Sequence, residues 1–176
     1  MTALVRAMAR RLTPLPVFVS ASAVGYYGDG GDTKLDETGA VGTSFAAILS
    51  ATWEAAALAA RPYAGRVVLA RIGVVLGREG GALAKLLPTT RALAGGAIAG
   101  GRQYVPWIHL SDAVEALAFA LITPAIDGPV NVVAPTPVPQ RVLAKAIGRA
   151  VHRPAIAPAP RFAMRLILGE AADVLL

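Results

Sequence analysis

The segment from Val17 to Gly28 constrains the fold most, because a short apolar run there ends in two serines and a glycine-flanked tyrosine pair. It reads Val-Phe-Val-Ser-Ala-Ser-Ala-Val-Gly-Tyr-Tyr-Gly. β-Branched and aromatic residues followed by small and turn-forming residues predict a buried strand that opens into a loop. In open α/β sheets, ligands bind beyond the carboxyl ends of the parallel strands. The pattern therefore predicts that Ser20 and Ser22 lie at the edge of a binding site.

The rest of the chain alternates between strand-like and helix-like segments. Apolar, β-branched runs predict strands at 17–20, 66–75 and 129–133. Helical spacing of apolar residues predicts helices at 1–12, 44–61, 82–93, 112–122, 140–151 and 162–175. Ser44 is predicted to cap one helix, and Asp112 with Glu115 to form a capping box on another. Pro88 is predicted to kink or split the helix at 82–93. Strands that alternate with helices predict a parallel sheet.

Composition excludes several classes of function. The chain has 176 residues and no cysteine, which excludes disulfides, thiolate catalysis and cysteine-bound metals. Prolines and glycines interrupt every apolar stretch before it reaches the roughly 20 residues of a spanning helix. The net charge is +6, but no nucleic-acid motif accompanies the basic residues, so we interpret them as solvated helix faces. We therefore predict a cytoplasmic protein that binds neither membranes nor nucleic acid.

Five blocks along the chain carry a family resemblance through their order and spacing. They are Ser20–Gly28, Arg71–Gly77, Trp107–Asp112, Gly128–Val132 and Leu168–Asp173. The first four resemble blocks of the extended short-chain dehydrogenases and sugar-nucleotide epimerases. A closer similarity, to an atypical epimerase-like subfamily of nucleoside-diphosphate-sugar epimerases, is carried by Ser20–Gly28, Trp53-Glu54, Gly80–Lys85 and Leu168–Asp173.

The resemblance implies an α/β fold, the carboxyl-terminal half of a Rossmann-like doubly wound parallel sheet plus a small α/β portion of a substrate domain. It divides the chain into an epimerase-like domain at 1–134, with a substrate-domain excursion around 78–108, and a helical segment at 135–176. The family's glycine-rich dinucleotide turn does not precede Val17 in this sequence. We therefore expect a chain truncated at its amino terminus and also at its carboxyl terminus.

The resemblance also implies a site for NADP or NAD and a small-molecule substrate. Ser22 matches the serine that hydrogen-bonds the reacting carbonyl or hydroxyl group in the family. The implied cofactor contacts are Ala21, Ser22, Phe45, Ile72, Gly73 and Val74. The implied substrate contacts are Tyr27, Gln103, Trp107 and His109. We expect at most weak cofactor binding by this chain on its own, and we make no prediction of its oligomeric state.

One departure from the family pattern limits the chemistry. Short-chain dehydrogenases move protons with a Tyr whose phenol, ordinarily titrating near pH ~10, is activated by a Lys four residues later. Phe45 and Leu49 occupy those positions here, and neither can move a proton. Three interpretations stay open. The chain belongs to an atypical NAD(P)-linked epimerase-like oxidoreductase, to a non-catalytic dinucleotide-binding protein, or to an inactive fragment.

Several ionisable residues have two readings from the sequence. Tyr26 and Tyr27 either reach the site or pack beneath their loop, and Arg71 either lines the nicotinamide pocket or forms a structural salt bridge. Glu54 is interpreted as a helix-surface or structural carboxylate that faces away from Phe45. His109 with Asp112 serves either proton transfer or local structure, and no third ligand at metal spacing accompanies them. We predict no metal site.

Overall fold

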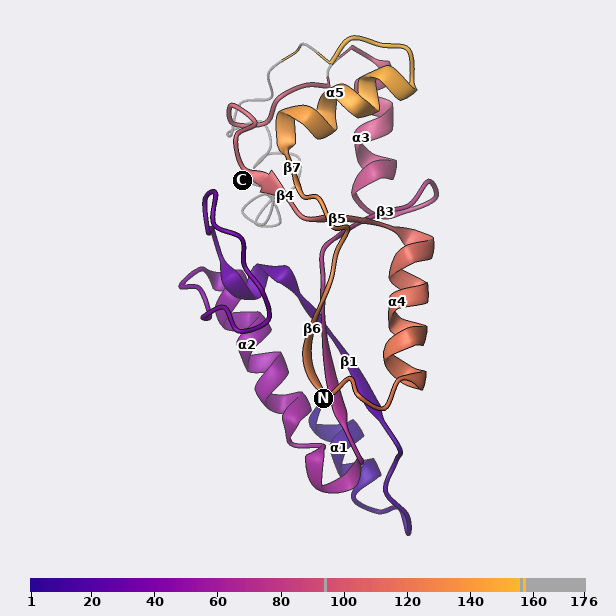
Figure 1. The fold of residues 1–176 in the computed structure, drawn as a ribbon. Helices are drawn as coiled ribbons and strands as arrows, with labels where there is room; N and C mark the ends of the chain where they lie inside the picture. The colour runs from indigo at the N-terminus through magenta and orange to yellow at the C-terminus, as the bar shows by residue number, and fades with distance from the viewer. Residues whose placement is uncertain (94, 156, 158–176) are drawn as a thin grey trace. The chain divides into compact units, whose positions relative to one another are not determined.

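The computed structural model describes residues 1–93, 95–155 and 157, so the helix predicted at 162–175 and the block Leu168–Asp173 lie outside the described residues. The chain forms two compact units (Figure 1). Residues 1–73 and 111–133 make up the first unit. The second contains residues 74–110 and the described residues from 134 onward.

A parallel sheet of three strands forms the centre of the first unit. The strands are β1 (Phe18–Ala23), β2 (Val67–Ile72) and β6 (Gly128–Val132), in the order β1-β2-β6. Both neighbouring pairs are parallel, which confirms the predicted sheet. β1 continues through both serines to Ala23, three residues beyond the predicted end at Ser20. Ser22 therefore lies within the ladder, opposite Arg71 of β2.

Helices α1 (Thr2–Met8), α2 (Phe45–Leu58) and α4 (Leu110–Ile122) accompany this sheet, and short 3-10 turns follow β1 at Val24–Tyr27 and α2 at Arg61–Tyr63. In Figure 1, α2 and α4 lie on opposite sides of the strands. α2 begins as predicted, because the Ser44 side chain accepts a hydrogen bond of 3.2 Å from the Ala47 N–H.

Small residues at the end of α2 and in the segment that follows it pack against the sheet. Ala57, Ala60 and Ala64 pack with Val67 and Leu69 in one buried cluster. Val67 is fully enclosed, and burying a side chain of this size contributes about 1.5–3 kcal/mol. The same helix also buries Ser50 and the charged Glu54, and a buried charge is unusual enough to mark the site described below.

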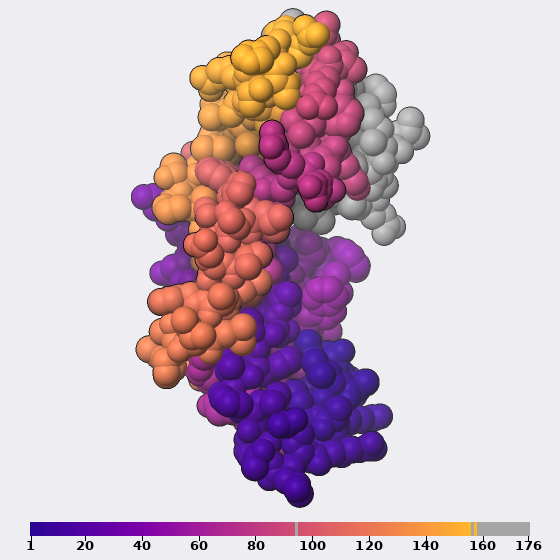
Figure 2. Space-filling model, turned by 90° about the vertical axis from the view of Figure 1, so that its right-hand side faces the viewer, coloured from indigo at the N-terminus to yellow at the C-terminus, as the bar shows by residue number. Residues whose placement is uncertain are grey.

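α4 begins at Leu110, two residues before the predicted cap, so the prediction that Asp112 caps this helix is wrong. Asp112 lies inside the first turn, where an acidic side chain still interacts favourably with the helix dipole. The helix carries an exposed apolar surface, and its salmon atoms are visible in Figure 2. The exposed large apolar residues of α4 are Leu110, Val114, Phe119, Leu121 and Ile122.

The described residues of the second unit form two short sheets and two helices. β3 (Val74–Leu76) pairs in parallel with β5 (Trp107–His109), and β4 (Tyr104–Val105) pairs antiparallel with β7 (Val138–Pro139). The helices are α3 (Gly81–Arg91) and α5 (Gln140–Ala150). Pro88 lies inside α3, which remains one helix, so the predicted split does not occur.

The single strand predicted at 66–75 is two strands that belong to different sheets. The Gly73 N–H donates to the Val132 carbonyl in the first unit, whereas the Val74 N–H donates to the Pro106 carbonyl in the second. The chain therefore leaves one unit and enters the other between these two residues. No helix among the described residues is long and apolar enough to span a membrane.

Candidate functional site

The carboxyl ends of β1 and β2 bring most of the predicted cofactor contacts together. Ala23 lies opposite Ile72 in the parallel ladder, and Ser22 lies opposite Arg71. Ser22 and Ala23 therefore lie close to Ile72 and to the Gly73 that follows it, whereas Ala21 lies further back along the strand, opposite Ala70. This is the end of the sheet where open α/β proteins bind ligands.

A buried ion pair lies directly beneath this end of the sheet. Arg71 donates from Nε to Glu54 Oε1 over 2.8 Å and from Nη2 to Oε2 over 2.9 Å. Both side chains are buried. The two-point geometry uses both carboxylate oxygens, which adds direction to the electrostatic attraction. The structural salt bridge, one of two readings of Arg71 from the sequence, is therefore formed, and Glu54 is its partner.

Two tyrosines also contact the Arg71 guanidinium, one through its ring and the other through its hydroxyl. Its Cζ lies 3.6 Å from the centroid of the Tyr26 ring, within the range of a cation–π contact. Arg71 Nη1 also donates to the Tyr27 hydroxyl over 2.9 Å. The rings of Tyr26 and Tyr27 meet edge to face, with centroids 5.5 Å apart. Both tyrosines therefore pack around the arginine.

The Tyr27 hydroxyl continues the network to β6. It donates to Asn131 Oδ1 over 2.7 Å while it accepts from Arg71. The Asn131 N–H donates to Glu37 Oε1 over 2.8 Å, and the Glu37 carbonyl accepts from Arg71 Nη1 over 3.2 Å. The loop that carries Glu37 is thus tied to the sheet. Sequence reasoning missed Glu37 and Asn131, although an Asn inside an apolar strand was a usable signal.

Gly42, further along the same loop, contacts the 3-10 turn Val24–Tyr27. Its N–H donates to the Tyr26 carbonyl over 2.8 Å. A Cβ at Gly42 would lie 2.5 Å from the Tyr27 carbonyl oxygen, which is closer than side chains can approach. Glycine is therefore required here by the close approach of two backbone segments.

Ser22 joins this network through Glu54. Its Oγ donates to Glu54 Oε1 over 2.7 Å, and the serine is 7% exposed. The Ser22 proton is thus committed to a carboxylate that Arg71 already holds. Among the described residues, every buried side-chain nitrogen and oxygen atom has a hydrogen-bond partner.

The Arg71 guanidinium is stabilised in its charged form. Desolvation by burial opposes the charge and by itself would lower the pKa of Arg71. Hydrogen bonds and Coulombic attraction involving Glu54 and Tyr27 outweigh that effect and raise the pKa of Arg71 above its usual value. The arginine therefore acts here as a fixed positive charge.

α2 presents Phe45 and Leu49 outward at the positions where the family resemblance has the catalytic Tyr and Lys. Phe45 is 79% exposed and Leu49 is 41% exposed. The one charged residue of α2, Glu54, is buried on the opposite side of the helix from Phe45. The exposed surface of α2 therefore offers no acid or base.

The predicted residues Val74, Gln103, Trp107 and His109 belong to the second unit. Gln103 is half-buried and donates from Nε2 to the Ile98 carbonyl over 3.2 Å. The Trp107 indole N–H donates to the Thr136 carbonyl over 3.2 Å. His109 is exposed at the last position of β5, while Asp112 belongs to the first unit.

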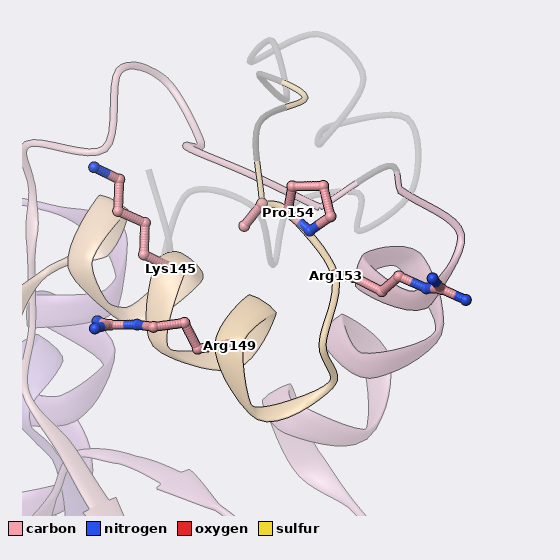
Figure 3. A pocket seen from close by; sticks show the side chains of 5 residues that line it. Lys145, Arg149, Arg153 and Pro154 are labelled. Carbon is pink, nitrogen blue, oxygen red and sulfur yellow. The ribbon is translucent and has the colours of Figure 1, made fainter.

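A separate cavity of about 400 Å³ lies beside α5 in the second unit. Lys145, Arg149, Arg153, Pro154 and Ala155 line it. In Figure 3 the Lys145 and Arg149 side chains point to one side, and Arg153 points to the other. The three cations do not converge on one point, so the cavity lacks the geometry of an anion site. The described part of the chain also holds no cluster of three or more His, Cys, Asp or Glu residues that could bind a metal ion.

The sequence is similar to those of several curated proteins named as epimerase family proteins, and two of them serve as examples. A protein of Mycobacterium leprae is 46% identical over 157 residues, which cover 89% of this chain and 51% of the relative. A chloroplastic protein of Arabidopsis thaliana is 42% identical over 160 residues, or 91% of this chain and 46% of the relative. The chain thus spans about half the length of these relatives. No family model matches the sequence.

Solved structures confirm the fold. A human epimerase family protein crystallised with NADPH superposes with a TM-score of 0.90 at 33% identity, over 99% of this chain and 59% of that chain. A nucleoside-diphosphate sugar epimerase from Corynebacterium glutamicum gives a TM-score of 0.75 at 31% identity, over 94% and 37% of the two chains. The predicted α/β class with a Rossmann-like parallel sheet is therefore correct. In sequence and in fold, the chain is therefore similar to epimerase family proteins over most of its own length.

Proposed function

We propose that this chain is part of an NAD(P)-dependent epimerase-like oxidoreductase that acts on a sugar nucleotide or a small carbonyl compound. One observation carries the proposal. Ser22, Ile72 and Gly73 lie at the carboxyl ends of two adjacent parallel strands. A relative of the same fold, 33% identical, is crystallised with NADPH. That end of the sheet is where α/β folds bind nucleotides.

In this proposal the nicotinamide of NADP or NAD contacts the first unit, and Ser22 lies against the reacting oxygen of the substrate. The proposed cofactor contacts are Ala21, Ser22, Phe45, Ile72, Gly73 and Val74. The proposed substrate contacts are Tyr27, Gln103, Trp107 and His109. Because the Tyr27 hydroxyl is already shared between Arg71 and Asn131, Tyr27 contributes its ring to the substrate and not a proton.

The same proposal divides the sequence into two regions with different roles. Residues 1–134 are the dinucleotide-binding portion with a substrate-domain excursion around 78–108, and residues 135–176 are the helical segment at the carboxyl end. The division into compact units at Val74, Ser111 and Ala134 supports an excursion of this kind.

A second candidate is a protein that binds a dinucleotide without turning over a substrate. The exposed Phe45 and Leu49 favour it, because α2 lacks the phenol and ammonium groups that move protons in ordinary members of the class. Both candidates bind a dinucleotide, and they differ in whether a substrate is converted.

Titration of the purified chain with NADPH and with NADH, followed by cofactor fluorescence, tests the shared part. Addition of UDP-glucose to the chain loaded with NADP+ or NAD+, and of a small ketone to the chain loaded with NADPH or NADH, then tests turnover. Binding with turnover supports the oxidoreductase, and binding without turnover supports the second candidate. Absence of binding at millimolar dinucleotide contradicts both for this chain.

A further inference from the structure

The position of the single Ser22 proton decides what this serine can do. A serine hydroxyl has one proton to donate and two lone pairs that accept. The Ser22 Oγ lies 2.7 Å from Glu54 Oε1, the usual length of an O–H···O hydrogen bond. A carboxylate can only accept, so the serine is the donor in this contact.

The carboxylate that takes this proton cannot turn away. Arg71 holds Oε1 through Nε and Oε2 through Nη2. The guanidinium is itself fixed by the Tyr26 ring and by the Tyr27 hydroxyl. The tyrosines therefore orient Arg71, and Arg71 orients Glu54. Glu54 in turn orients the Ser22 hydroxyl.

We propose that Arg71 and Glu54 are positioning residues that fix the Ser22 hydroxyl as a hydrogen-bond acceptor toward the ligand. Ser22 then recognises a hydrogen-bond donor, such as a hydroxyl group, and does not donate to a carbonyl oxygen. The statement about the ligand rests on the proposed function. The statement about the proton rests on the contacts alone.

Ser20 shows that this orientation is not a general property of β1. It lies two residues earlier, so its side chain points to the same face of the strand, and its 6% exposure matches the 7% of Ser22. Its hydroxyl reaches only the Ala21 carbonyl, at 3.4 Å, which is long for a hydrogen bond between oxygens. Ser20 is therefore a matched control with nearly equal burial and a backbone carbonyl, not a carboxylate, as its partner.

The absence of cysteine from the sequence allows a direct test. Ser22→Cys places one thiol against Glu54, and Ser20→Cys places one at the control position. The pKa of each thiol is measured from the ultraviolet absorbance of its thiolate as a function of pH. A second pair of chains carries the same thiols together with Glu54→Gln.

We expect Glu54→Gln to lower the thiol pKa of Ser22→Cys by about one unit or more, because a repelling carboxylate is lost and Arg71 is left to attract the thiolate. The shift in Ser20→Cys should be clearly smaller. Equal shifts at the two positions, or none at Ser22→Cys, would overturn the proposal. A purely structural role for Glu54 moves stability and leaves the difference between the two thiols unchanged.

Infrared spectroscopy keeps the proposal testable should the Glu54→Gln chains fail to fold. The S–H stretch of Ser22→Cys should lie at lower frequency than that of Ser20→Cys, because only the former thiol donates to a carboxylate. Coincident S–H bands would overturn the proposal. Neither thiol measurement needs a cofactor, so the proposed function can fail in the NADPH titration while this inference stands, and the reverse also holds.

Discussion

Arg71 and Glu54 bind each other at two points inside the protein, with Nε to Oε1 at 2.8 Å and Nη2 to Oε2 at 2.9 Å. One residue comes from β2 and the other from α2, so the pair joins the sheet to the helix that covers it. Because Ser22 donates to the same carboxylate, the pair also connects the fold to the candidate site.

Removing one member of this pair should destabilise the protein strongly. Arg71→Met leaves the Glu54 carboxylate buried without its cation, and such losses amount to about 3–5 kcal/mol in the free energy of unfolding. Urea unfolding followed by circular dichroism measures the change. Arg61→Met is the control, because the Arg61–Asp127 pair is 49% and 42% exposed and should contribute less than about 1 kcal/mol. Equal losses in the two variants would contradict the assigned role of Arg71.

Arg66 donates hydrogen bonds to backbone carbonyls at the carboxyl end of α4 and just after it. Its guanidinium donates to the carbonyls of Ala120, Leu121 and Ile126. Arg66→Lys keeps the charge but cannot reach three acceptors with the same planar fork, so unfolding should need about 1–3 kcal/mol less. Thermal unfolding of Arg66→Lys beside wild type and an exposed control, Arg102→Lys, checks this. An unchanged midpoint in Arg66→Lys would show that charge alone suffices.

Ser44 should contribute to the stability of α2 through its side chain. Ser44→Ala removes the acceptor for the Ala47 N–H and should lower the free energy of unfolding by about 1 kcal/mol. The neighbouring exposed Thr43, changed to Ala, is the matched control. Chemical denaturation of the two variants compares them, and a larger loss in Thr43→Ala would be inconsistent with the cap.

Stability in acid should depend on Asp127. The hydrogen bond from Arg61, followed by that from the Val67 N–H, lowers the pKa of Asp127 in the folded protein. Since the folded value lies below the unfolded one, the contribution is present above pH ~4 and is lost as the pH falls through the folded pKa. Asp127→Asn should therefore differ from wild type by less than about 1 kcal/mol near neutrality and by progressively less in acid. A difference that grows in acid would contradict the assigned direction.

Local patterns in the sequence were sufficient for much of the fold. The alternation of strands and helices predicted the parallel sheet, and a serine ahead of an alanine-rich run predicted the cap at Ser44. The strand at 66–75 was predicted as one element because most of its residues are apolar and several are β-branched. The break at Gly73 depends on Val74 pairing with Trp107, and no local pattern reports that distant partner.

The candidate site shows the same limit. Ser22 was identified from the strand and the loop that follows it, but its partner was not, because Glu54 lies 32 residues away. Glu54 and Arg71 are 17 residues apart in sequence, and they meet only once α2 packs on β2. Asp112 was assigned as a cap from its spacing to Glu115, whereas α4 starts earlier at Leu110.

The central claim is that the carboxyl ends of β1 and β2 bind the nicotinamide portion of a dinucleotide. Backbone amide NMR spectra of the chain titrated with NADPH test it most directly, because they detect even weak binding and locate it. The account predicts shifts that saturate at Ser22, Ile72 and Gly73, with smaller changes beside the cavity at Lys145 and Arg149. Unchanged resonances along β1 and β2 at millimolar NADPH, or shifts confined to that cavity, would contradict it.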